Sequence, residues 1–214
     1  MKAFDLYAER YDAWYEKPFG WSVFSLEVEC LKRLTDYPEP SLEIGVGSGR
    51  FAKALGVEFG VDTSKELLKI AKSRGIRGIL ARAEALPFRK EVFKRTLFVV
   101  SICFLQDPIT ALKEARRVLK EDGKLVLGLV LRESPWADFY LQKAKEGHPL
   151  YSLARFYSFE DIIKMLSIAG FKLEKVFTTL FEEPQDMKPV ESREIREGFH
   201  PDGGFFCMLA GLEI

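Results

Sequence analysis

The chain reads Leu-Glu-Ile-Gly-Val-Gly-Ser-Gly-Arg from residue 42 to residue 50 and Phe-Gly-Val-Asp-Thr-Ser from residue 59 to residue 64. This order is typical of a strand, a glycine-rich turn, a helix and a second strand that ends on a carboxylate. Alternate glycines let the backbone turn sharply and approach a ligand closely, and the amides of the following helix attract negative charge. Asp62 is placed to accept hydrogen bonds from ribose hydroxyls. The stretch therefore predicts a site for an adenosine-type cofactor.

The residues around the glycines separate two cofactor classes. A dinucleotide fingerprint that starts at Gly45 ends on Arg50, which does not fit, whereas one that starts at Gly47 ends on Ala52, a shifted match. Glu43 precedes the first glycine, where a carboxylate would repel a diphosphate and attract the ammonium of a methionine moiety. A cofactor with a methionine part is therefore favoured. The alternatives are that Glu43 is a solvated residue at a strand end, and that the chain is a nicotinamide-dependent oxidoreductase.

Composition predicts one compact enzyme domain. The 214 residues are 47% hydrophobic and 30% charged, which is enough chain for a substantial core. Lys plus Arg and Asp plus Glu balance at 32 each, so we expect no nucleic-acid partner. No apolar run approaches the ~18 residues of a membrane helix and no signal-peptide core is present, so we expect no membrane association and a cytoplasmic location. The lack of asparagine and the low glutamine count are typical of proteins from hot environments.

Cysteine and histidine are too scattered for a disulfide framework or a metal centre. Cys30, Cys103 and Cys207 are isolated in apolar neighbourhoods, which predicts buried packing. His148 and His200 lie far apart, without the spacing of zinc ligands. No metal is therefore expected, neither histidine is assigned a role as a base, and His200 is predicted to be part of a turn.

Periodicity predicts alternating helices and strands over most of the chain. Helical spacing covers residues 4–16, 22–34, 109–119 and 159–169. Strand signals lie at residues 41–44, 56–61, 78–81, 96–101, 124–131, 172–180 and 205–212. Thr63 and Glu66 have the spacing of a capping box for a helix that runs to about residue 73. Residues 132–158 are rich in aromatic side chains and show no clear strand, which fits either an insertion on the substrate side or a structural helical excursion.

Four sequence blocks occur in an order that resembles a known family. Besides residues 42–50 they are Val-Asp-Thr-Ser at 61–64, Ala-Glu-Ala-Leu-Pro-Phe at 83–88, and Asp-Pro at 107–108 followed by residues 111–131. In this order they resemble the class I S-adenosylmethionine-dependent methyltransferases, and within them the type 11, ubiquinone-biosynthesis-like small-molecule group. The resemblance extends from about residue 7 to residue 177.

The resemblance implies a fold and a division of the chain. We expect an α/β, Rossmann-like doubly wound sheet of seven strands in the order 3-2-1-4-5-7-6, with strand 7 antiparallel. Residues 1–214 would form a single domain. Its parts would be an N-terminal helical lid at 1–35, a cofactor-binding half at 36–131, a substrate-side insertion at 132–158, and a C-terminal helix with the antiparallel strand pair at 159–214.

The resemblance also implies a function and the residues that serve it. It implies methyl transfer from S-adenosyl-L-methionine to a small-molecule acceptor by in-line attack, aided mainly by proximity and desolvation. The residues implied to bind the cofactor are Glu43, Gly45, Gly47, Ser48, Gly49, Asp62, Thr63, Ser64, Leu67, Ala83, Glu84, Ala85 and Ser101. Those expected at the acceptor are Tyr7, Tyr11, Trp14, Phe104 and Trp136. No catalytic residue is identified, and the acceptor and the oligomeric state are left open.

Two departures from the family pattern bear on function. Arg82 stands where the family often has an aspartate that reaches the adenine amino group, and an arginine side chain has no acceptor. After Ser101 the chain continues Ile-Cys-Phe-Leu, residues 102–105, where the family often has a polar pair with histidine. These departures keep open a non-catalytic protein of the same fold that binds S-adenosylmethionine for regulation or assembly.

Overall fold

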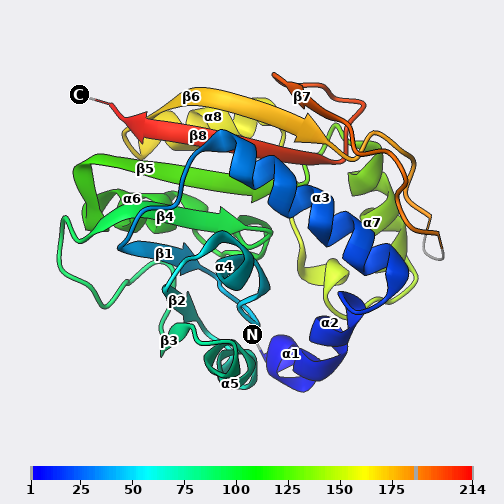
Figure 1. Ribbon diagram of the computed structural model, residues 1–214, viewed down its shortest axis with the longest axis horizontal. Helices are drawn as coiled ribbons and strands as arrows, with labels where there is room; N and C mark the ends of the chain where they lie inside the picture. Colours follow the sequence, from blue (N-terminus) through cyan, green and yellow to red (C-terminus); the bar gives the residue numbers. More distant parts are fainter. Residues whose placement is uncertain (1, 186–187, 214) are drawn as a thin grey trace.

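One open sheet forms the middle of the molecule, and helices cover both of its faces (Figure 1). The computed structural model describes residues 2–185 and 188–213. The strands lie in the order β3-β2-β1-β4-β5-β8-β6-β7. They are β1 (Ser41–Ile44), β2 (Phe59–Asp62), β3 (Arg77–Leu80), β4 (Phe93–Val99), β5 (Leu119–Leu129), β6 (Phe171–Thr179), β7 (Ile195–Glu197) and β8 (Phe205–Leu212). The predicted α/β, Rossmann-like class is confirmed.

The sheet has eight strands, one more than predicted. Strands β1 to β5 pair in parallel, and β8 lies antiparallel between β5 and β6, as the predicted order requires. The additional strand β7 is three residues long and pairs with the outer edge of β6. The hydroxyls of Thr178 and Thr179 donate to the carbonyls of Gly198 and Glu194, each at 2.7 Å. A three-residue strand is too short to show a pattern of its own, and its position depends on β6, which is distant in sequence. The sequence therefore did not predict it.

The helices follow the predicted alternation with local differences. They are α1 (Lys2–Leu6), α2 (Ala8–Trp14), α3 (Pro18–Leu34), α4 (Arg50–Leu55), α5 (Lys65–Ser73), α6 (Pro108–Val118), α7 (Pro135–Lys145) and α8 (Phe159–Ile168). The single helix predicted at 4–16 is two helices, separated at Tyr7. Helix α3 begins at Pro18 rather than at residue 22, since proline suits the first turn of a helix. Ser64, not Thr63, caps α5, because the Leu67 amide donates to its hydroxyl at 3.2 Å.

Two hydrophobic cores lie on opposite faces of the sheet. Helices α3, α4 and α7 pack one core, which includes Phe24, Phe51 and Trp136. Helices α6 and α8 pack the other core, which includes Leu112 and Ile162. Figure 1 shows α3 crossing in front of the sheet and α6 and α8 behind it. The parallel strands are therefore covered on both sides, which explains why their sequences are almost continuously apolar.

The place where β1 and β4 end positions the candidate site. These strands are neighbours, but the chain leaves β1 toward β2 on one side and leaves β4 toward β5 on the other. Parallel sheets bind ligands at such a reversal, beyond the carboxyl ends of the strands. Val100, directly after β4, has a φ of +50°, an uncommon conformation for a β-branched residue. Strain of this kind concentrates at functional sites.

Candidate functional site

The glycine-rich turn after β1 allows two close approaches that a side chain would prevent. A Cβ on Gly45, whose φ is +77°, would collide with the Cβ of Ser101 at the end of β4. A Cβ on Gly49, also at φ +77°, would lie 3.1 Å from the Cβ of Ala71 on α5. The first glycine therefore opens the crevice between β1 and β4, and the second lets α4 pack against α5.

Asp62 closes the turn from the neighbouring strand. Its two carboxylate oxygens accept hydrogen bonds from the backbone amides of Gly47 at 2.8 Å and of Ser64 at 2.9 Å. Burial raises the pKa of Asp62 above its ordinary value, although the amides of Ser64, Gly47 and Thr63 favour the charged form. Each carboxylate oxygen retains acceptor capacity for a further donor. Asp62 is thus held rigidly with its acceptors at the edge of a cavity.

A cavity of about 320 Å³ lies over this turn. The predicted cofactor residues that line it are Gly45, Gly47, Asp62, Thr63, Leu67, Ala83, Glu84 and Ser101. They come from the ends of β1, β2 and β4, from the loop after β3 and, for Leu67, from α5, so folding gathers blocks that are far apart in the sequence. The hydroxyl of Ser101 donates to the Ile44 carbonyl at 2.7 Å, which ties β4 to the start of the turn.

Five predicted cofactor residues do not line this cavity: Glu43, Ser48, Gly49, Ser64 and Ala85. Glu43 lies within the sheet, is 1% exposed, and has a carboxylate oxygen without a hydrogen-bond partner among the described residues. Burial raises the pKa of Glu43 well above its ordinary range; the Ala52 amide opposes this rise and the charge of Asp62 adds to it. Its predicted contact with the methionine ammonium stays a prediction.

Two acids attach the N-terminal segment, α1 and α2, to the turn and to α5. Asp12 accepts hydrogen bonds from Arg50 Nε and Arg74 Nη2, each at 2.8 Å. Asp5 accepts a hydrogen bond at 2.6 Å from the hydroxyl of Ser64, the residue that caps α5. Burial alone would raise the pKa of Asp12, but hydrogen bonds from Arg50, Arg74 and Ser48 outweigh it and lower the pKa to about 2. The charged pairs therefore persist throughout the physiological pH range.

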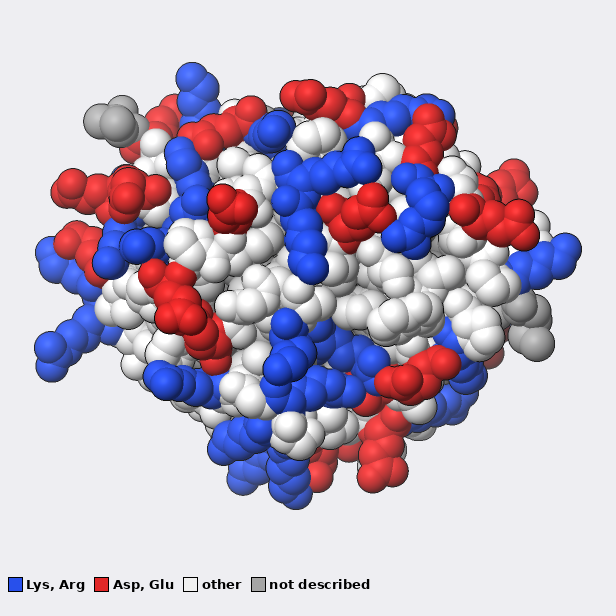
Figure 2. All heavy atoms as spheres, in the orientation of Figure 1, with Lys and Arg blue, Asp and Glu red and all other residues white. Residues whose placement is uncertain are grey.

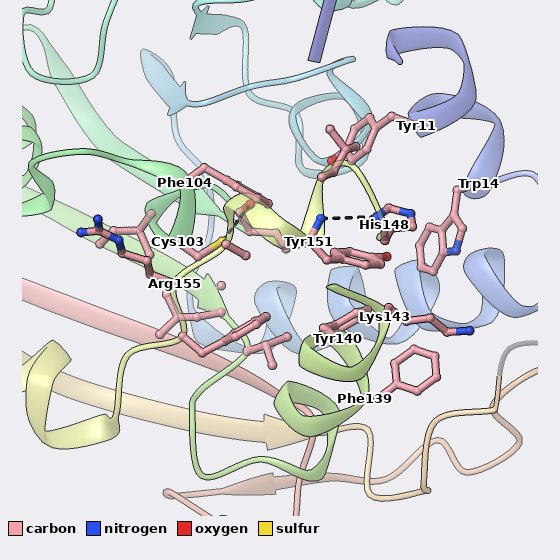
Figure 3. Close-up of a pocket in the computed structure, with 18 of the residues that line it drawn as sticks. Tyr11, Trp14, Cys103, Phe104, Phe139, Tyr140, Lys143, His148, Tyr151 and Arg155 are labelled. Carbon is pink, nitrogen blue, oxygen red and sulfur yellow. Dashed lines mark hydrogen bonds between the residues drawn. The ribbon is translucent and has the colours of Figure 1, made fainter. Parts of the chain in front are cut away.

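A second cavity of about 430 Å³ adjoins the first and is lined mainly by aromatic residues (Figure 3). It contains four of the five predicted acceptor residues, Tyr7, Tyr11, Trp14 and Phe104. The residues that line both cavities are Phe4, Tyr11, Val100, Phe104 and Arg155. The two spaces therefore meet between the N-terminal segment and the loop that follows β4.

Trp136 does not line the second cavity. Its side chain is 1% exposed and stacks on Phe19 with ring centroids 6.0 Å apart. Its indole N–H donates to the Glu182 carbonyl at 2.9 Å. The residue is a satisfied part of the core, and we do not retain it as an acceptor contact.

The second cavity contains residues that the sequence analysis did not select. Figure 3 shows Phe139, Tyr140 and Lys143 from α7 near His148 and Tyr151. The His148 ring stacks on Tyr151 with centroids 4.0 Å apart, and its Nδ1 accepts the Tyr151 amide at 3.3 Å. His200 lies elsewhere, where its carbonyl accepts the amide of Gly203 in the predicted turn at 2.9 Å.

Among the described residues that line the second cavity, Glu27 is the acid, and the sequence carried a signal for it. It lies on the buried face of α3 among apolar neighbours such as Val23, Leu26 and Leu31. Its side chain is 6% exposed. An acid at a core position of an amphipathic helix is unusual, because burying an unpaired carboxylate is costly.

Basic and acidic side chains are interspersed over the face shown in Figure 2. No helix in residues 2–185 and 188–213 combines the length and apolar character that a bilayer crossing needs. In the same part of the chain, no cluster of three or more His, Cys, Asp or Glu side chains is arranged to hold a metal.

Comparison with known proteins identifies the family. A family model described as a methyltransferase domain matches residues 42–127. A solved structure from Thermotoga maritima, described as an S-adenosylmethionine-dependent methyltransferase and possible histamine N-methyltransferase, is 36% identical, with a TM-score of 0.88 over 99% of both chains. The chain belongs to the S-adenosylmethionine-dependent methyltransferases. An uncharacterized protein of Methanocaldococcus jannaschii is 40% identical over 98% of both chains. The demethylmenaquinone methyltransferase of Thermotoga maritima is 31% identical over 59% of each chain.

Family membership confirms the predicted enzyme class and cofactor. This methyltransferase uses S-adenosyl-L-methionine, and the resemblance to the type 11 group is confirmed. The observed cradle fits that cofactor, because a Cβ at Gly45 would obstruct the crevice and the acceptors of Asp62 lie at its edge. These relatives give no support to a non-catalytic role.

Arg82 in this methyltransferase is predicted to be dispensable for cofactor binding. Arg82 lines the first cavity, but its side chain is 51% exposed and its ion pair with Glu84 spans 3.4 Å. An exposed pair of this kind contributes little, so Arg82→Asp should change affinity for S-adenosylhomocysteine by less than about fivefold. Titration calorimetry checks this. A severe loss of binding in a folded variant would show that Arg82 contacts the cofactor directly.

Proposed function

We propose that this methyltransferase methylates a small molecule bound in the aromatic second cavity, beside a cofactor bound in the first. The observation that supports it most strongly is that the two cavities adjoin and share five lining residues. A small acceptor and a methyl donor held on either side of that junction would be in proximity, which contributes up to ~7 to 11 kcal/mol of the barrier reduction.

The residues of the first cavity would hold separate parts of the cofactor. Asp62 would accept from the ribose hydroxyls, the turn that contains Gly45 and Gly47 would contact the methionine part, and Ala83 and Glu84 would border the adenine. When bound, the cofactor supplies a methyl group on a positively charged sulfur, which keeps the electron pair of the broken bond. The protein then has to orient the acceptor and exclude water.

The aromatic side chains between the cavities suit orientation rather than proton transfer. The Tyr11 and Tyr15 hydroxyls are hydrogen-bonded at 3.1 Å, and burial raises the pKa of both above the ordinary tyrosine value. Burial also raises the pKa of the Cys103 thiol to about 12. These groups therefore stay neutral near pH 7 and provide a water-poor wall around the reacting atoms.

Small amines with an aromatic ring are the first acceptor class to test. The Thermotoga maritima relative is described as a possible histamine N-methyltransferase, and the second cavity here is walled by rings. Incubation with S-adenosylmethionine and a panel of such amines should give products heavier by one methyl group, detected by mass spectrometry together with S-adenosylhomocysteine. The same panel with phenols and carboxylates covers oxygen acceptors. The proposal would be contradicted if none of the amines, phenols and carboxylates in the panel were methylated.

The N-terminal segment would act as a lid over both cavities. Phe4 and Tyr11 line both spaces, and Asp5 and Asp12 fasten the segment to the cofactor half. We predict that hydrogen exchange of residues 4–20 slows when S-adenosylhomocysteine binds. Exchange that is already slow and unaffected by the ligand would indicate a permanently packed pair of helices.

Asp12→Ala provides the matched variant for the lid. Removal of a carboxylate that pairs with two arginines should speed exchange of residues 4–20 by about tenfold or more without ligand. Asp36→Ala, at an exposed position outside both cavities, is the control. The cytoplasmic location and the hot source also remain predictions.

A further inference from the structure

The carboxyl group of Glu27 is buried in the wall of the second cavity. No residue within 2–185 or 188–213 donates a hydrogen bond to it or forms an ion pair with it, and burial raises its pKa. It points to a space that is large enough for a ligand of several heavy atoms, about 430 Å³. Buried charges in proteins are normally paired. An unpaired acid at a cavity wall therefore indicates that its partner arrives with the ligand.

The walls around this carboxylate suit an organic cation. Aromatic residues that line the same cavity are Phe4, Tyr7, Tyr11, Trp14, Tyr15, Phe19, Phe104, Phe139, Tyr140, Tyr151, Phe156 and Tyr157. Ring faces attract cations, most strongly where water is excluded. Two partly buried basic residues also line the cavity: Lys143, which pairs with Glu146 at 3.9 Å, and His148, which stacks on Tyr151. The other basic residues of the lining, Arg10, Lys17 and Arg155, are solvent-exposed, so their charges are screened. A negative charge formed on Glu27 would act in a poorly hydrated interior.

We infer that Glu27 binds the amino group of the methyl acceptor and that the acceptor is therefore an aromatic or otherwise apolar amine. This inference rests on the proposed function and names the substrate class of the same site. Glu27 would accept hydrogen bonds from the ammonium group of the acceptor, while the aromatic rings of the cavity hold the rest of the acceptor. It would also move a proton: the nitrogen gives one proton to a Glu27 oxygen and keeps the bonding pair as a lone pair, so both groups become neutral.

Proton release on binding provides a direct signature of this pairing. Burial raises the pKa of Glu27 to about 8, so the acid is mostly protonated in the free protein at pH 7. An approaching ammonium favours the carboxylate, and about one proton is released for each amine that binds. The titratable or charged groups that interact with Glu27 or share its cavity are Tyr11, Tyr15, Cys103, Cys207, Arg10, Lys17, Lys143, His148 and Arg155, together with the other cavity tyrosines.

The experiment is titration calorimetry at pH 7 with S-adenosylhomocysteine present in excess. The probes are histamine, 2-phenylethylamine and tyramine, each compared with the alcohol of the same carbon skeleton, in two buffers of different ionisation enthalpy. For at least one amine we expect tighter binding than its alcohol and release of about one proton. In Glu27→Gln, affinity for that amine should fall about ten- to hundredfold and proton release should disappear, with little change for the alcohol.

Glu29→Gln is the matched control, because it makes the same chemical change on the exposed side of α3, where Glu29 pairs with Arg33 and Arg193. It should behave like the unmodified protein. Equal binding of amines and alcohols, or amine binding and proton release that are unchanged in Glu27→Gln, would overturn the inference. A failure of the proposed function is distinguishable, since it would appear as absence of methylated product from the amines, phenols and carboxylates alike in the mass-spectrometric panel.

Discussion

Asp62→Ala is expected to weaken binding of S-adenosylhomocysteine by about ten- to hundredfold, which corresponds to about 1.5 to 3 kcal/mol for loss of a charge-assisted contact. The carboxylate has two roles that the variant removes together. It offers acceptors to the ribose, and it holds the amides of Gly47 and Ser64 at 2.8 and 2.9 Å in the shape of the turn. Without this carboxylate the glycine-rich turn would lose those two hydrogen bonds, and ordering the turn would reduce the free energy gained when the ligand binds.

Titration calorimetry measures the effect, with a size-matched variant for comparison and a second variant as the control. Asp62→Asn keeps the size of the side chain but replaces one acceptor oxygen with a donor, so it should bind S-adenosylhomocysteine weakly as well. Asp36→Ala removes an exposed acid outside both cavities and should bind normally. Undiminished affinity in a folded Asp62→Ala protein would place the ribose elsewhere.

Glu27→Gln is expected to change how stability depends on pH. In the unfolded chain this carboxyl titrates near its ordinary value of 4.5, whereas burial raises its pKa in the folded protein to about 8. A raised folded pKa contributes stability that is fully present below the unfolded value and is lost as pH rises toward the folded value. The unmodified protein should therefore lose about 3 to 5 kcal/mol from this group between about pH 4.5 and pH 8.

The glutamine variant has no charge to bury, so it escapes this loss. Urea unfolding at pH 5 and pH 9 gives the difference in unfolding free energy between the two proteins at each pH. The variant should gain about 3 to 5 kcal/mol relative to the unmodified protein between these pH values. Any constant cost of a buried amide cancels in this comparison. A difference that is the same at both pH values would mean that Glu27 ionises like an exposed acid.

The cofactor half could be predicted from the chain because its signals are local. The alternate glycines at 45, 47 and 49 and the acid at 62 belong to one strand-turn-helix-strand unit, whose backbone requirements are met by neighbouring residues. Strands β1 and β8 were predicted with their observed ends, 41–44 and 205–212. Their apolar patterns are dictated by burial, which a sequence displays directly.

Caps and edges were predicted less well because they depend on competing or distant partners. Thr63 and Ser64 both follow Asp62, and either hydroxyl is chemically able to cap α5. In the structure Ser64 caps α5, and its hydroxyl also donates a hydrogen bond to Asp5 of the N-terminal segment. Strand β7 likewise forms only where Thr178 and Thr179 of β6 meet it.

The identity of the residues at the second cavity depends on folding most of all. Trp136 is an aromatic residue of a type that often contacts ligands. Packing nevertheless places it in the core, where its indole N–H donates to the Glu182 carbonyl. Glu27 is an acid among apolar residues of a helix, but the packing of α3 over the sheet decides that it lines the second cavity. Alternation and turn chemistry are properties of adjacent residues and can be read along the chain. Burial of a particular side chain depends on which elements pack against it, and that is settled when the helices and the sheet come together.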